Sequence, residues 1–181
     1  MLKEIKADLY RYKSVPYSFS VLVRGLRSQG FRYMFFRRLR DKYKGNPFQN
    51  LVYSFFLRRY TYKYGFQIGG KIGPGFFIGH FGTIVVSVNT SFIRNCNIAH
   101  NVNIGAARGK NAGAPQIGNE VWIGTGSVLV GKITIGDDVM IAPNSYVNFD
   151  VPPHSLVIGN PGIIKSRINA TENYIHNKWI G

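Results

Sequence analysis

The sequence is poor in acidic residues and almost free of cysteine. Its 181 residues include 23 Lys and Arg but only 8 Asp and Glu, which gives a formal net charge of +15. The single cysteine, Cys96, excludes a disulfide within the chain. No apolar segment near Met1 resembles a secretion signal, and no uninterrupted apolar run is long enough to cross a bilayer. A cytoplasmic location is therefore expected.

The positive charge is concentrated at the N-terminus. Residues 1–64 hold 15 basic and 3 acidic residues, a net of +12, which leaves 8 basic and 5 acidic residues, or +3, for the rest of the chain. This segment is also rich in aromatic residues. The chain thus divides into a basic, aromatic leader at 1–64, a central region at 65–168 and a tail at 169–181.

The central region carries a repeat of six residues. An aliphatic residue, or Phe92 in one place, recurs at this spacing between Lys71 and Ile164. A six-residue period fits neither an amphipathic helix nor an alternating strand, and it is typical of a β-solenoid of short stacked strands. Three such strands close one triangular coil, so the anchor residues predict four coils. The anchors are Ile72, Ile78, Val86, Phe92, Ile98, Ile104, Ile117, Ile123, Leu129, Ile135, Ile141 and Val147. Cys96 falls four places after Phe92, at an inward position, and is expected to fill the core.

The leader is predicted to be helical. Ser14-Val15-Pro16 and Lys44-Gly45-Asn46-Pro47 mark breaks, and helices are expected at Gly30–Tyr43 and Phe48–Tyr64. Phe31, Phe35 and Leu39 would share one face, which either packs against the first coil and a neighbouring subunit or lies on an anionic membrane surface. No known nucleic-acid-binding module is visible. The arginines that fall largely off this face are Arg32, Arg37, Arg38 and Arg40.

Four sequence runs together resemble a known family. They are GFFIGHFGTIVV (75–86), NCNIAHNVNIG (95–105), GAPQIGNEVWIG (113–124) and VPPHSLVIGNPGIIKSR (151–167). The chain resembles the hexapeptide-repeat acyltransferases, and within them the serine acetyltransferase-like branch, which includes surface-polysaccharide O-acetyltransferases. The resemblance covers residues 65–168. It implies a mainly β fold, a left-handed parallel β-helix with an α-helical N-terminal segment, a homotrimer, and acetyl-CoA as the acyl donor.

Two histidines are candidate catalytic residues. His80 lies between Gly79 and Gly82, where the resemblance implies a general base that takes the proton of the attacking hydroxyl. His80 and His100 each lie two places past an anchor, so they should meet on adjacent coils about 5 Å apart. A proton on one imidazole would then disfavour a proton on the other and keep His80 neutral, so that it can accept a proton. His100 is either a site residue or an inert surface histidine, and two imidazoles without a third ligand predict no metal site.

The resemblance also implies residues for binding CoA and the acceptor. Small corner residues would let the pantetheine arm approach the backbone, and the segment after the last anchor would hold the adenine and 3′-phosphate. These residues are Gly105, Gly124, Thr125, Ala142, Pro143, Asn160, Pro161, Lys165 and Arg167. An inserted loop at 106–116 carries Arg108 and Lys110, which either attract phosphate or an acidic sugar or simply belong to a solvated, flexible loop. The resemblance implies that this loop reaches a neighbouring subunit.

Departures from the family pattern bear on the acceptor. Serine acetyltransferases have Asp at the position of Gly79 and a second His at the position of Ala114, and this chain lacks their Asp-Pro-Ala stretch in the leader. Without these groups little remains to hold the ammonium of serine. The sequence therefore predicts an acetyl-CoA-dependent O-acetyltransferase for a saccharide in surface polysaccharide or glycoconjugate biosynthesis. The alternatives are serine O-acetylation in cysteine biosynthesis and a non-catalytic trimeric scaffold.

Overall fold

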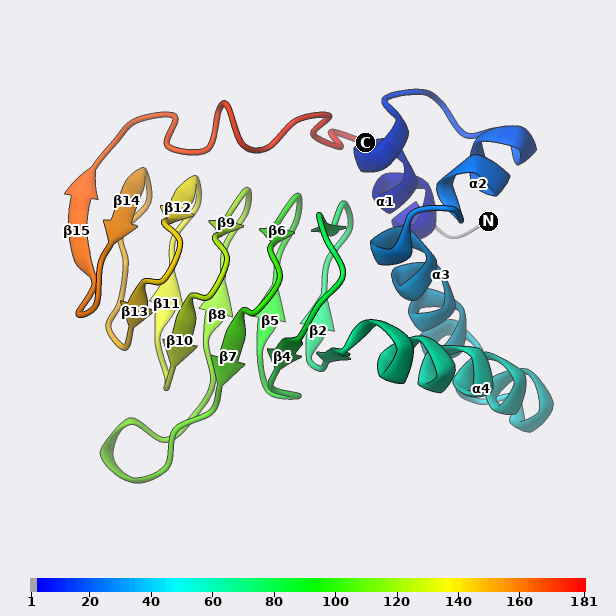
Figure 1. The fold of residues 1–181 in the computed structure, drawn as a ribbon, viewed down its shortest axis with the longest axis horizontal. Coiled ribbons are helices and arrows are strands. Elements are labelled where there is room, and N and C mark those ends of the chain that lie inside the picture. The colour runs from blue at the N-terminus through cyan, green and yellow to red at the C-terminus, as the bar shows by residue number, and fades with distance from the viewer. Residues whose placement is uncertain (1–2) are drawn as a thin grey trace.

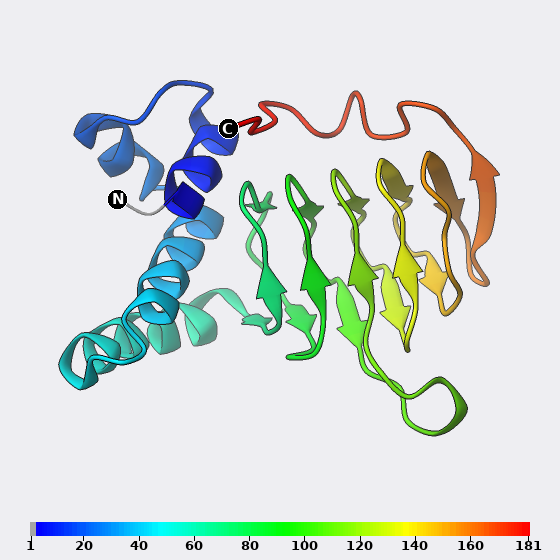
Figure 2. The same cartoon turned by 180° about the vertical axis from the view of Figure 1, so that it is seen from behind.

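The computed structural model describes residues 3–181. Figure 1 shows a solenoid of short strands with four helices gathered at one end. The last residues of the chain return along the solenoid and end beside the first helix, which the view from behind in Figure 2 also shows. The two ends of the solenoid are therefore linked by the tail.

The leader forms four helices whose ends follow local capping rules. α4 begins after Asn46, whose side-chain oxygen accepts a hydrogen bond from the Gln49 N–H at 3.0 Å, and it ends at Gly65, which has a φ of 74°. The helices predicted at 30–43 and 48–64 correspond to α3 and α4 within one residue. The bounds are α1 Lys3–Lys13, α2 Phe19–Gly25, α3 Gln29–Lys42 and α4 Pro47–Tyr64.

The apolar face predicted on α3 packs inside the leader. Phe31 is fully buried in a cluster with Ile5, Leu9 and Val21 from α1 and α2, and Phe35 and Leu39 pack against that cluster. This face is therefore a packing surface.

The solenoid has three faces, each a sheet with one strand from every coil. The first sheet contains β1 Phe66–Ile68, β4 Ile84–Val86, β7 Asn103–Gly105, β10 Val128–Val130 and β13 Tyr146–Val147. The second contains β2 Lys71–Ile72, β5 Ser91–Phe92, β8 Gln116–Ile117 and β11 Thr134–Ile135. The third contains β3 Phe77–Ile78, β6 Asn97–Ile98, β9 Trp122–Ile123, β12 Val139–Ile141, β14 Ser155–Ile158 and β15 Ile163–Ser166. All neighbours are parallel except β14 and β15. The predicted fold class, a left-handed parallel β-helix with a helical N-terminal segment, is confirmed.

The prediction of four coils is wrong, because the first sheet has five strands and the solenoid has five coils. Ile68 stacks on Val86, and Val151 and Val157 continue the columns above Ile135 and Ile141. Ile68 and Val151 lie four residues from an adjacent anchor, Ile72 and Val147 respectively, so the six-residue count missed them. Cys96 is buried and free, and desolvation by burial raises the pKa of its thiol to about 12, as expected for a core residue.

The open end of the first coil is closed by arginines from the leader. A first coil has no preceding coil, so its carbonyl groups need other donors. Arg37 donates to the Ile68 and Gly70 carbonyl oxygens, and Arg38 donates to those of Ile72 and Gly73. Both side chains are buried. Sequence reasoning put these arginines off the apolar face but missed that they cap the solenoid.

Further leader residues complete this cap. Asp8 pairs with the Arg38 guanidinium, with Nε to Oδ2 at 3.0 Å, and accepts the Phe76 N–H at 2.9 Å. The Tyr12 hydroxyl donates to the Ile78 carbonyl and accepts the Ile78 N–H, both at 2.9 Å. Burial raises the pKa of Asp8, and Arg38 opposes that rise. The cap therefore depends on a buried ion pair.

The tail crosses the corner between the second and third sheets. Asp138 accepts hydrogen bonds from the Ala170 and Thr171 N–H groups, both at 3.0 Å. Nearer the leader, Lys178 pairs with Glu120, and the Trp179 N–H donates to Asn95 Oδ1 at 3.0 Å. The tail contacts several coils and is thus part of the fold. Within residues 3–181, no helix is both long enough and apolar enough to cross a bilayer.

Candidate active site

The strand register brings one column of predicted site residues together. In the third sheet Ile78, Ile98, Ile123, Ile141 and Val157 lie directly above one another. The residues two places later therefore stack at the corner between the third and first sheets. We call this column the histidine corner, and it consists of His80, His100, Thr125, Pro143 and Gly159.

The two histidines are the first two residues of this column. Their ring centroids are 5.9 Å apart and the rings are nearly perpendicular, at 88°. His80 is exposed, whereas His100 is partly buried and its Nδ1 atom has no hydrogen-bond partner among the described residues. The predicted juxtaposition is confirmed, with the two rings edge-on.

A longer turn presents His80 to solvent. Ile78 and Val86 are eight residues apart, whereas Ile98 and Ile104, the anchors on the next coil, are six apart. The extra residues form a turn that is held where the Gly82 N–H donates to the Tyr64 carbonyl oxygen at 3.1 Å. The longer turn comes after His80, which keeps its place in the column beside His100.

Gly82 is a site residue that sequence reasoning missed. Its φ is 138°, which residues with a side chain rarely adopt, and a Cβ atom there would lie 3.1 Å from the His100 Cβ. The signal was present in the sequence, because glycines stand on both sides of His80, at 79 and 82. Gly82 allows the His80 turn to pass close to His100.

The rest of the histidine corner carries small side chains. Beyond His100 the column consists of Thr125, Pro143 and Gly159, and the positions just before these three hold Gly124, Ala142 and Ile158. Gly124 is required by the stacking itself, since a Cβ there would lie 2.6 Å from the Pro143 nitrogen. With no bulky side chain along this column, the surface suits a slender ligand such as the pantetheine arm of CoA. Asn160 and Pro161, which were predicted to bind CoA, follow directly after Gly159.

Other predicted site residues lie elsewhere on the same chain. Gly105 is the last residue of β7, and the loop bearing Arg108 and Lys110 leaves the solenoid there. This is where the strands of the first sheet end, whereas His80 lies where they begin. Figure 1 shows this loop projecting away from the strands. Lys165 lies opposite Leu156 in the antiparallel β14–β15 ladder, and the Arg167 N–H donates to the His154 carbonyl oxygen. The chain therefore moves away from the histidine corner along β15. Within one chain these residues do not meet His80.

No acidic residue lies near His80 in the sequence. No Asp or Glu occurs anywhere between Asp41 and Glu120. Space for one exists at Gly79, where the nearest atom to an added Cβ is 3.6 Å away, while Ala114 is buried. Among residues 3–181, no group of three or more His, Cys, Asp and Glu side chains is placed to hold a metal ion.

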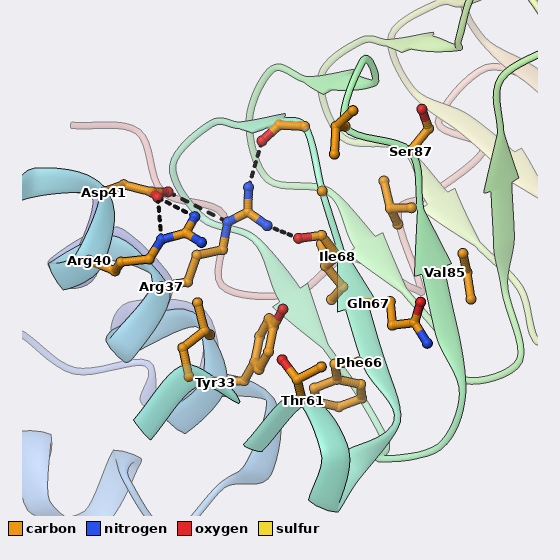
Figure 3. A pocket seen from close by; sticks show the side chains of 15 residues that line it. Tyr33, Arg37, Arg40, Asp41, Thr61, Phe66, Gln67, Ile68, Val85 and Ser87 are labelled. Carbon is orange, nitrogen blue, oxygen red and sulfur yellow. Dashed lines mark hydrogen bonds and ion pairs between the residues drawn. The ribbon is translucent and has the colours of Figure 1, made fainter. Parts of the chain in front are cut away.

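A cavity of about 610 Å³ lies apart from the histidines. Figure 3 shows it between α3, α4 and strands β1 and β4, with Tyr33, Phe66 and Gln67 on its walls. Three charged side chains line it, and all are already engaged: Arg37 donates to the Ile68 and Gly70 carbonyl oxygens, and Arg40 pairs with Asp41. The contacts of Arg37 close the solenoid, so we place the candidate active site at the histidine corner.

Comparisons with known proteins agree with this fold. Residues 114–148 match the family model described as bacterial transferase hexapeptide (six repeats). A serine acetyltransferase of Helicobacter pylori is 38% identical over 94 residues, which are 51% of this chain and 54% of that protein. The mitochondrial serine acetyltransferase 3 of Arabidopsis thaliana is 41% identical over 98 residues, which are 53% of this chain and 25% of that protein.

Solved structures extend the likeness over most of the chain. The serine acetyltransferase of Neisseria gonorrhoeae in complex with serine has a TM-score of 0.71 and 27% identity, and the match covers 89% of this chain and 67% of that one. The enzyme of Brucella abortus strain S19 in complex with coenzyme A has a TM-score of 0.71 and 25% identity, with 91% and 66% covered. The resemblance to the serine acetyltransferase-like branch of the hexapeptide-repeat acyltransferases is confirmed. The chain spans about half or less of the length of the two curated relatives described above.

Proposed function

We propose that this hexapeptide-repeat chain, of the serine acetyltransferase-like branch, transfers an acetyl group from acetyl-CoA to a hydroxyl, with His80 as general base. The observation that carries the proposal is the histidine corner. An exposed imidazole stands on a glycine-flanked turn, and an open column of small residues continues from it. Residues 65–168 are proposed as the catalytic unit.

The proposed chemistry is a direct acyl transfer. His80 takes the proton from the acceptor hydroxyl while its oxygen attacks the thioester carbonyl carbon. The resulting tetrahedral oxyanion then collapses, the carbon–sulfur bond breaks, and the proton on His80 returns to the departing thiolate. His100 would act as a positioning residue, because its ring contacts that of His80 edge-on at 5.9 Å.

The donor is proposed to lie along the histidine corner. Gly124, Thr125, Ala142 and Pro143 would face the pantetheine arm, and Asn160 and Pro161 would lie near the adenine end. A slender, flexible arm suits a surface without bulky side chains. The coenzyme A complex of the Brucella abortus relative supports CoA as the ligand. Lys165 could reach the phosphates, whereas the position of Arg167 on the far side of the third sheet gives it less support.

Serine is the acceptor that similarity favours. The relatives described above are serine acetyltransferases, and one was solved with serine bound. Saccharide acetylation, the first expectation from the sequence, has no support from these comparisons. One observation keeps it as a second candidate, since residues 42–119 contain no carboxylate that could pair with the ammonium of serine.

A homotrimer is part of the proposal. Arg108 and Lys110 lie on a loop that projects away from the chain's own histidine corner, so they can serve a site only on a neighbouring copy. Acceptor binding would then use residues from two subunits.

An acceptor panel tests the proposal. Release of the CoA thiol from acetyl-CoA would be followed with serine, with other hydroxy amino acids, with nucleotide sugars and with oligosaccharides. Turnover that depends on serine, with O-acetylserine found by mass spectrometry, would support the main proposal. Turnover with a saccharide alone would replace serine by the second candidate. No turnover, together with no change in melting temperature on adding CoA, would favour the scaffold alternative.

A further inference from the structure

Helix α4 has apolar side chains on two opposite faces. Its inner face packs against α3, where the Phe56 and Phe36 rings stack with centroids 4.9 Å apart and Leu57 is buried. Its outer face is exposed to solvent. Four large side chains there have exposed fractions of 65–74%: Phe48, Leu51, Phe55 and Tyr62.

These four residues form a continuous stripe. At about 100° of rotation per residue, positions 48, 51, 55 and 62 fall within about 60° of one another around the helix axis. Leu57 and Tyr64, which are buried, lie on the opposite side. We call the four exposed residues the outer stripe of α4. An amphipathic helix has one apolar face, so a second one predicts a second contact.

Basic residues flank the outer stripe. Arg58, Arg59 and Lys63 are exposed, and the Arg58 guanidinium lies 5.7 Å from the centre of the Tyr62 ring. These three residues fall on the same half of the helix as the stripe. No acidic residue occurs within α4 or in the 55 residues that follow it, up to Glu120. The surface is therefore apolar along its centre and positively charged at its edges.

We propose that the outer stripe of α4 binds the surface of an anionic membrane. Aromatic and aliphatic side chains enter the boundary between headgroups and acyl chains, while Arg and Lys side chains stay among anionic headgroups. Each basic residue near such a surface contributes about 1 kcal/mol of attraction. Figure 1 shows α4 at the end of the molecule away from most of the solenoid, where a flat surface can approach.

A second copy of the chain is a poorer occupant for this surface. Two outer stripes brought together would also bring together Arg58, Arg59 and Lys63 of both copies, with no carboxylate of α4 to pair with them. An anionic bilayer supplies both the apolar phase and the opposite charge. This inference does not depend on the proposed enzymatic function.

Vesicle sedimentation tests the inference. The full chain would be mixed with vesicles of phosphatidylcholine alone or of phosphatidylcholine with phosphatidylglycerol, and the bound fraction measured. Three variants are compared with the native protein. The apolar variant carries Phe48→Ser, Leu51→Ser and Phe55→Ser, and the charge variant carries Arg58→Gln, Arg59→Gln and Lys63→Gln. The control variant removes three exposed apolar side chains of the central region by Val88→Ser, Ile93→Ser and Ile168→Ser. Circular dichroism checks that each variant is folded.

The inference predicts binding to the anionic vesicles but not to the neutral ones. The apolar and charge variants should each bind at least tenfold more weakly, the control should bind like the native protein, and raising the ionic strength to about 0.5 M should weaken binding. Absence of native binding, or native-like binding by the apolar variant, would overturn the inference. A change in oligomeric state of the apolar variant in sedimentation velocity, without vesicles, would instead assign the stripe to contact between copies.

Discussion

Replacing Arg38 by methionine removes the central donor of the cap that closes the first coil. Arg38 pairs with Asp8 and donates to the Ile72 and Gly73 carbonyl oxygens, and the Arg38 and Asp8 side chains are only 9% and 1% exposed. Methionine keeps much of the apolar length of the side chain. The variant therefore isolates the loss of the guanidinium, which leaves the buried Asp8 carboxylate without its counter-ion and two carbonyl groups without their donor.

The size of the effect follows from these losses. Removing one partner of a buried ion pair costs about 3–5 kcal/mol, and each carbonyl left without a donor costs about 1 kcal/mol more. We expect the free energy of unfolding to fall by about 5 kcal/mol. For a chain of this size that lowers the melting temperature by about 10–20 °C. Calorimetry and urea unfolding followed by circular dichroism, at matched protein concentrations, measure both quantities.

Two further variants make the assignment specific. Combining Arg38→Met with Asp8→Asn removes the lone buried charge while Asn can still accept the Phe76 N–H, so about half of the lost stability should return. Arg40→Met is the matched control on the same helix, because Arg40 pairs with Asp41 at an exposed site and should cost less than about 0.5 kcal/mol. If Arg38→Met were no more destabilising than Arg40→Met, the account of the cap would be refuted.

Three more predictions follow from other parts of the structure. Partial burial raises the pKa of Asp138, but hydrogen bonds from His154, Thr171 and Ala170 outweigh that effect and hold the pKa below its ordinary value. The carboxylate therefore stabilises the docked tail above a pH of about 4. This stability should be lost as the pH falls through the folded pKa, which emission from Trp122 and Trp179 would report, and Asp138→Asn should remove that pH dependence. Gly82→Ala should lower the free energy of unfolding by about 1–2 kcal/mol because of its positive φ and the contact with His100. Gly79→Ala should change it by less than about 0.5 kcal/mol, because the added Cβ would make only an ordinary van der Waals contact with Phe77. Finally, Cys96 should not react with a thiol reagent until the protein unfolds, because burial keeps it protonated. Rapid labelling of the native protein would contradict that burial.

The repeat and the histidine pair could be predicted because both follow from local spacing. Anchors six residues apart fix which residues face the core, and residues two places past Ile78 and Ile98 must then stack. Ile68 and Val151 were missed where the spacing at a corner shortens to four residues. The number of coils therefore came out one too low.

The roles of the leader arginines and of the tail could not be predicted in the same way. Arg37 and Arg38 resemble surface residues in sequence, since nothing local shows that carbonyl groups some 30 residues away need donors. The tail is held by residues such as Asp138 and Asn95, which occupy ordinary solenoid corners. Long-range hydrogen bonds decide both features. The same limit applies to Arg108 and Lys110, whose proposed role depends on a neighbouring subunit.

The most direct test of the account is the acetyl-transfer rate of a His80→Asn variant, measured beside its affinity for CoA. Asparagine is close to histidine in size and polarity but cannot take the proton of the acceptor hydroxyl. With the acceptor that the native protein uses, kcat should fall by about 10²–10⁴-fold while the Kd for CoA changes by less than about twofold. A variant that binds CoA normally and keeps most of its kcat would show that His80 is not the general base.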